Sequence, residues 1–277
     1  MEVNFLLPIS LFTMIALSIL IYKRVAEKTK ELLGDKKIGL REAISIVIFI
    51  SVLVIIIGLI PGYAIQILFI AAFSYILFIF TYLLSKRAIA SAIPPAIYVT
   101  VFLLLNYLIT TNALIIILVT NLFSALFAII AITLLGPLFS WRVLMLFAAL
   151  LTAMDIIHVF ITGYMVEAAH RVIGLGLPLM LLLPRPPSLT ELTALGLGDV
   201  FLSGLLSAHT TSKYSLKAGL LTAASISMIF LAFDIIVYKF TWQVKTFPAT
   251  LLVLLGWLLG ISPYILKSEG NITKLRH

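Results

Sequence analysis

Apolar residues run through this chain in long, nearly unbroken stretches that short charged or glycine-containing segments separate. A helix that crosses a hydrocarbon core of about 30 Å needs about 20 such residues. This criterion predicts nine spans, with these approximate limits: 4–22, 43–60, 63–84, 88–108, 112–138, 143–163, 191–209, 215–238 and 247–266. The pattern therefore predicts an all-α polytopic membrane protein with about nine transmembrane helices.

Two long connections interrupt the predicted spans. The first, residues 23–42, is rich in basic and acidic residues and is expected to be a solvated amphipathic segment. The second includes the apolar stretch 172–183, in which Gly174, Gly176 and Pro178 disfavour a helix. An apolar stretch with such breakers is typical of a short strand or a re-entrant segment.

These connections suggest how one integral membrane domain is organised. Residues 1–163 form a six-helix N-terminal part, residues 164–190 a connecting loop, and residues 191–277 a three-helix C-terminal part. Within the first part, Pro94 and Pro95 lie inside the fourth span, where they are expected to kink the helix or delay its start.

The composition agrees with a membrane solvent. Of the 277 residues, 62% are hydrophobic and 11% charged, and the mean hydropathy is +1.22. A soluble domain would need more polar surface than this. The absence of cysteine excludes disulfides and thiolate metal sites. The net charge of +8 does not indicate nucleic acid, because the Lys and Arg residues lie between the apolar runs.

The distribution of basic residues predicts an orientation. Fifteen of the 19 Lys and Arg residues lie on the side of the 23–42 connection and the C-terminal tail. Cytoplasmic loops carry this excess, so the N-terminus is expected outside and the C-terminus in the cytoplasm. The first apolar run has no basic region before it and no cleavage site of small residues. It is therefore expected to remain as the first transmembrane helix.

Three aspartates fall inside predicted spans, where an acidic group costs several kcal/mol and needs a reason. Asp155 and Asp199 lie well within the sixth and seventh spans. Asp234 lies five residues before Lys239, close to an interface where water or a lysine can reach it. His158 follows Asp155 by one turn and is interpreted as a structural histidine, because no second ligand accompanies it. No metal or cofactor is expected.

The segment around Asp199 indicates a chemistry. Gly196 and Gly198 each lower helix stability by about 1 kcal/mol relative to alanine. Because glycine has no side chain, both residues allow another backbone to approach the aspartate closely. Two carboxyl groups in a low-dielectric site do not both ionise readily, so they share one proton. Such a pair can hydrolyse an amide, one carboxylate activating water and its protonated partner polarising the carbonyl.

An aspartate in the sixth span, the sequence Gly196-Leu197-Gly198-Asp199 in the seventh and Pro248-Ala249 at the ninth resemble the GxGD intramembrane aspartyl proteases, the presenilin and signal peptide peptidase family. The chain is similar to the short archaeal members. The resemblance implies that Asp155 and Asp199 are the catalytic pair. It also implies that Gly196, Leu197, Gly198 and Pro248-Ala249-Thr250 support the active site and contact substrate. Met154 and Thr250 stand where the family often has tyrosine and leucine.

The same resemblance implies transmembrane peptide substrates in a lipid bilayer. With the N-terminus outside, these would be type II segments or signal-peptide remnants, and the stretch 172–183 could pair with an unwound substrate strand. Two alternatives remain. A prepilin-type peptidase also uses GxGD, but it has fewer spans and a basic residue soon after the aspartate. A proton- or cation-coupled transporter could bind its ion at Asp155 and Asp199, although no internal repeat supports this.

Overall fold

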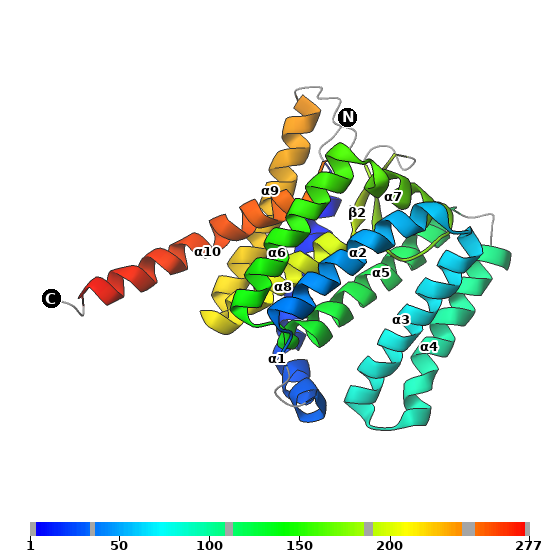
Figure 1. The fold of residues 1–277 in the computed structure, drawn as a ribbon, viewed down its shortest axis with the longest axis horizontal. Coiled ribbons are helices and arrows are strands. Elements are labelled where there is room, and N and C mark those ends of the chain that lie inside the picture. Colours follow the sequence, from blue (N-terminus) through cyan, green and yellow to red (C-terminus); the bar gives the residue numbers. More distant parts are fainter. Residues whose placement is uncertain (1–3, 34–36, 109–112, 186–190, 240–246, 275–277) are drawn as a thin grey trace.

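The computed structural model describes residues 4–33, 37–108, 113–185, 191–239 and 247–274. These residues form a helical bundle with one small hairpin (Figure 1). In chain order the elements are α1 Leu6–Leu33, α2 Leu40–Leu59, α3 Gly62–Ser85, α4 Ala88–Leu103 with its π-turn η1 Leu104–Leu108, α5 Ala113–Leu135 with the 3₁₀ turn η2 Gly136–Leu138, α6 Trp141–Ile156 with the π-turn η3 Ile157–Ile161, α7 Tyr164–Gly174, β1 Met180–Pro184, β2 Leu192–Gly196, α8 Leu197–Lys213, α9 Leu216–Lys239 and α10 Ala249–Lys274.

Eight helices in the described part of the chain are long and apolar enough to cross a membrane. They are α1 to α6, α9 and α10, where α4, α5 and α6 include the turns that continue them. They correspond to eight of the nine expected spans and begin within three residues of the expected starts, although α1 and α10 continue beyond the expected ends. Helix α3, for example, covers Gly62–Ser85 against an expected 63–84. The expectation of an all-α polytopic membrane protein is confirmed.

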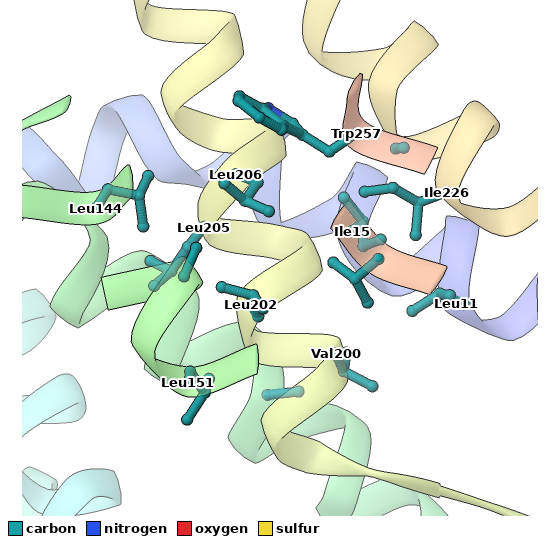
Figure 2. Close-up of a cluster of buried hydrophobic side chains, with 14 of the residues drawn as sticks. Leu11, Ile15, Leu144, Leu151, Val200, Leu202, Leu205, Leu206, Ile226 and Trp257 are labelled. Carbon is teal, nitrogen blue, oxygen red and sulfur yellow. The ribbon is translucent and has the colours of Figure 1, made fainter. Parts of the chain in front are cut away.

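The remaining expected span, 191–209, is only partly a helix. Residues 192–196 form strand β2, and α8 begins at Leu197. Hydropathy alone does not separate a short apolar strand from the start of an apolar helix. Although α8 is only 17 residues long, it lies at the centre of the bundle. Figure 2 shows its apolar side chains among those of the surrounding helices: Leu11, Ile15, Leu144, Leu151, Val200, Leu202, Leu205, Leu206, Ile226 and Trp257.

Two further expectations need correction. The segment 23–42 is not all connection, because α1 continues to Leu33. No proline or glycine lies between Lys23 and Gly34, and Lys23 and Glu27 have the spacing that supports a helix in water. Of the two effects expected of Pro94 and Pro95, a kink or a late start, the late start does not occur, because α4 begins at Ala88 and runs through both prolines.

The hairpin lies within and just after the expected connecting segment. Strand β1 is the short strand expected from the stretch 172–183, whereas residues 172–174 belong to α7. The strands are antiparallel, and Leu182 is opposite Ala194. Helix α7 is attached to the end of α2, because Arg171 Nη1 donates to the carbonyl oxygens of Ile57 and Ile60, at 2.6 and 3.0 Å. Carbonyls at a helix C-terminus lack partners within the helix, and a cation satisfies them well.

Candidate active site

Asp199 lies in the first turn of α8, directly after strand β2. Gly196 ends the strand with an extended backbone and precedes the first helical residue, Leu197. The Leu197 amide still donates to the Leu179 carbonyl across the hairpin, at 3.0 Å. Asp199 was expected to have helix on both sides. Instead the polypeptide changes from strand to helix three residues before it, so its carboxyl group lies beside free helical N–H groups.

Asp155 lies in the last turn of α6, before the π-turn η3, and faces the first turn of α10. The Thr250 hydroxyl donates to Asp155 Oδ2 at 2.7 Å, and the Thr250 backbone N–H donates to the same oxygen at 3.4 Å. Helix α10 begins at Ala249, directly after Pro248. Asp155 therefore occupies the position of a capping side chain for α10, although it comes from another helix.

The two carboxyl groups belong to one buried site. Asp155 and Asp199 are each 8% exposed. Helices α6 and α8 are in contact, and α10 contacts both of them. Each carboxyl group lies at a helix N-terminus, Asp199 at that of α8 and Asp155 at that of α10. The positive ends of both helix dipoles therefore favour negative charge here.

The two glycines of the motif differ in their surroundings. A Cβ atom on Gly196 would lie 3.0 Å from Asp199 Oδ2, a tight contact with the carboxylate. A Cβ atom on Gly198 would meet no atom within 4 Å. Gly196 thus lets the end of the strand approach the acid closely, whereas Gly198 borders open space next to it.

Thr250 is the residue at which the third motif departs from the family pattern, and it is the residue that contacts Asp155. A leucine there could not donate a hydrogen bond from its side chain. The backbone N–H at position 250 would remain available as a donor to Asp155. Threonine in place of leucine therefore adds a side-chain hydrogen bond to Asp155, and residue 250 adjoins this aspartate in either case.

His158 and Asp234 have partners of their own. The two ring nitrogens of His158 lie 2.7 Å from Ser51 Oγ and 3.3 Å from Thr162 Oγ1, which agrees with a structural histidine. Asp234 pairs with Arg185, whose Nη2 is 2.5 Å from Asp234 Oδ1. It was expected near an interface with water or a lysine. The arginine partner was not foreseen, because it lies 49 residues away in the chain.

The outer edge of β1 is occupied by α5. The Asn121 side-chain amide donates to the Leu182 carbonyl at 2.7 Å and accepts from the Leu182 N–H at 2.8 Å. Ser124 Oγ donates to the Met180 carbonyl at 2.9 Å. Asn121 thus joins helix α5 to strand β1. Edge β1 is therefore closed to a further strand.

In the described part of the chain, the outer edge of β2 has no such cover. Hydrogen bonds from Arg185 to Glu191 and from Leu197 to Leu179 set which residues of the hairpin face each other. By the alternation of an antiparallel pair, Leu192, Ala194 and Gly196 direct their N–H and C=O groups away from β1. Leu192 and Ala194 are exposed. Within the described residues, nothing pairs with this edge, which leads directly to Asp199.

A polytopic membrane bundle with two buried carboxyl groups on contacting helices, and a strand edge that leads to one of them, has the features of an intramembrane aspartic protease. The family model for signal peptide peptidase matches residues 95–248, more than half of the chain, and this range includes Asp155 and Asp199. The chain belongs to the signal peptide peptidase family, whose members are intramembrane aspartic proteases. No curated protein matches the chain in a sequence comparison.

Proposed function

We propose that Asp155 and Asp199 together hydrolyse peptide bonds within transmembrane segments. The observation that carries this proposal is the juxtaposition itself: two acids, each 8% exposed, lie on α6 and α8, which contact each other and are both contacted by α10. A buried acid without a counter-charge is costly, and a pair of them is costlier still unless they share a proton. The family match favours hydrolysis over ion-coupled transport as the use of this pair.

In the proposed mechanism the pair holds one proton and one negative charge. We assign the charge to Asp155, because the Thr250 hydroxyl and the N-terminus of α10 both stabilise a carboxylate there. Asp155 then accepts a proton from water as the water oxygen attacks the peptide carbonyl carbon. Asp199 gives its proton to the carbonyl oxygen, so that a neutral gem-diol forms. Return of a proton from Asp155 to the nitrogen releases the amine, and Asp199 recovers its proton from the diol.

The substrate is proposed to bind as a strand along β2. A helix shields its carbonyl groups, so a transmembrane substrate must unwind before water can attack. The outward-facing groups of Leu192, Ala194 and Gly196 offer the hydrogen bonds that an unwound segment loses. This replaces the stretch 172–183 as the pairing edge, because Asn121 and Ser124 occupy the outer side of β1.

The basic residues support type II substrates or signal-peptide remnants. Fifteen of the 19 Lys and Arg residues lie on the side of the α3–α4 connection and the C-terminal tail, which we assign to the cytoplasm. The chain lacks cysteine, so a single cysteine introduced at Arg87 or at Gly174 can be labelled selectively. Labelling of position 174 alone from outside intact cells is expected, and the reverse pattern would refute the orientation.

Cleavage of a labelled transmembrane peptide by the purified protein tests the proposed pair. Asp155→Asn and Asp199→Asn each remove a carboxylate while preserving shape, and each is expected to reduce kcat by about a thousandfold or more. Glu31→Gln, an exposed acid, serves as the matched control and should cleave normally. Melting in detergent should confirm that all variants fold. Substantial cleavage by either aspartate variant would refute the assignment.

An inhibitor that resembles the tetrahedral intermediate distinguishes the protease from the transporter. We expect it to bind the unaltered protein and to protect it against thermal unfolding, because ligand binding to the folded state raises stability. The Asp199→Asn variant should lose this protection. A protein that neither cleaves nor binds the inhibitor, but moves protons in vesicles in an Asp199-dependent manner, would favour the transporter.

A further inference from the structure

A second polar cluster lies at the far end of the hairpin from the catalytic pair, and the proposed mechanism does not use it. It consists of Asn4, Arg185, Thr193 and Asp234, and we call it the anchor cluster. In chain order, these residues lie just before α1, just after β1, in strand β2 and in the last part of α9. Asn4 is 1% exposed, and the side chains of Arg185 and Asp234 are mostly covered.

The contacts of the anchor cluster join the hairpin to two helices. Arg185 Nη2 lies 2.5 Å from Asp234 Oδ1, and the Asn4 backbone N–H donates to Asp234 Oδ2 at 3.1 Å. The Asn4 side chain donates to Thr193 Oγ1 at 3.2 Å. The Arg185 N–H also closes the hairpin by donating to the Glu191 carbonyl at 2.8 Å. Both strands are thereby held against α1 and α9 by groups with little access to solvent.

The position of β2 has a direct consequence for where a substrate is cut. Thr193 is six residues before Asp199, and the polypeptide between them is strand and then the first helical turn. A substrate strand paired with β2 advances about 3.3 Å per residue. A displacement of the hairpin by that amount would therefore place a neighbouring peptide bond at the catalytic pair.

We infer that Asp234 and Arg185, held by Asn4, are positioning residues that fix the hairpin and so select which bond of the substrate is cleaved. This inference rests on the proposed function, because it concerns the same catalytic pair. It differs from a general structural role, since it assigns the choice of cleaved bond to a salt bridge remote from the reacting atoms. Removing the salt bridge should leave the chemistry intact and broaden the choice of bond.

The test compares Asp234→Asn, Arg185→Gln and the double variant with the unaltered protein. Mass spectrometry of the products from one transmembrane peptide identifies the bonds that are cut. We expect the product from a bond one or two residues away to rise at least about tenfold relative to the main product, which corresponds to about 1.4 kcal/mol of lost discrimination. Each single variant leaves one charge of the pair without its partner and could fold poorly for that reason. The double variant removes both charges, so the choice of cleaved bond can still be measured with it.

The matched control is Glu31→Gln, which breaks the exposed pair of Glu31 and Lys86, 3.5 Å apart. It should leave the product pattern unchanged. Deuterium exchange of the 180–196 amides gives a readout that does not need activity: exchange should accelerate in Asp234→Asn and stay unchanged in Glu31→Gln.

Two results would overturn the inference alone. One is an unaltered product pattern in all three anchor variants. The other is a loss of melting temperature and of kcat/KM together with an unchanged cleavage site, because that is what a merely structural salt bridge would produce. If the unaltered protein cleaves no peptide, the proposed function fails. In that case the deuterium exchange of the hairpin amides still tests the anchor cluster. Equal exchange rates in Asp234→Asn and the unaltered protein would show that the salt bridge does not fix the hairpin.

Discussion

Helices α8 and α4 are similar in length and opposite in environment. Eleven of the 17 residues of α8 are buried, against three of the 16 residues of α4. Helix α8 contacts α1, α5, α6, α9 and α10, whereas the main partner of α4 is α3. Figure 1 shows α3 and α4 side by side at one edge of the bundle. One helix is thus surrounded by protein, and the other faces mostly lipid.

This difference explains where the chain tolerates polar residues. Helix α8 carries Asp199, Ser203 and His209, all buried. Ser203 Oγ donates to the Asp199 carbonyl at 2.7 Å, and His209 Nε2 lies 3.0 Å from the Gly136 carbonyl oxygen. Helix α4 instead exposes Ile89, Ile93 and Ile97. High hydropathy therefore marks contact with lipid, and the helix that bears the site is among the less apolar ones.

The largest effect on stability is expected where α10 packs against α9, beside α8. A Cβ atom on Gly256 would lie 2.4 Å from Ile226 Cα, and one on Gly260 would lie 2.6 Å from Thr222 Cα. Backbone atoms cannot move aside as a side chain can, so Gly256→Val must separate the helices. We expect a loss of about 3 kcal/mol, the upper part of the range for overpacking, visible as a lower melting temperature in detergent.

The matched control for this prediction is Ile97→Ala on the exposed face of α4. It should change the melting temperature little, because substitutions away from packed features usually stay within about 0.5 kcal/mol. Equal destabilisation by Ile97→Ala and Gly256→Val would remove the contrast between the central and the peripheral helices.

The helices could be predicted from sequence mainly because lipid imposes one length and one composition on them. An exposed helix such as α3 must present about 20 apolar residues, and its limits follow. The rule fails at residues 192–196, because Leu-Thr-Ala-Leu-Gly is equally compatible with a strand. The pairing of this segment with β1 depends on tertiary contacts, including those of Asn121 to Leu182.

The candidate acids could be predicted for the same reason, since a charge in an apolar span stands out. Their partners could not. Thr250 reaches Asp155 across 95 residues, and Arg185 reaches Asp234 across 49. A threonine in an apolar span and an arginine in a loop are both common, so nothing in the sequence marks Thr250 or Arg185 as the partner of an aspartate. Such contacts become visible only when the helices are placed relative to one another.

A middle-sized effect is expected at Thr250. Thr250→Val preserves the shape of the side chain and removes the hydroxyl that donates to Asp155 Oδ2 at 2.7 Å. A hydrogen bond to a charged group contributes about 1.5–3 kcal/mol, so kcat/KM should fall about 10- to 100-fold while the melting temperature changes little. Thr250→Ser keeps the hydroxyl and should retain most of the activity. If Thr250→Val cleaves as well as the unaltered protein, this hydroxyl does not support the charge on Asp155.

The smallest effect concerns the outer edge of β2, where a substrate is proposed to pair. Ala194 directs its N–H away from β1, so Ala194→Pro removes a donor from the free edge and keeps the hydrogen bonds of the hairpin. Loss of one neutral hydrogen bond costs about 0.5–1.5 kcal/mol, so kcat/KM should fall by up to about tenfold. Ala194→Val keeps the N–H and should act as the control. The fall should appear mainly in KM, because the lost bond holds the substrate before and during the reaction alike. An unchanged KM in Ala194→Pro would mean that the substrate does not pair with β2, and that the open edge beside Asp199 has another role.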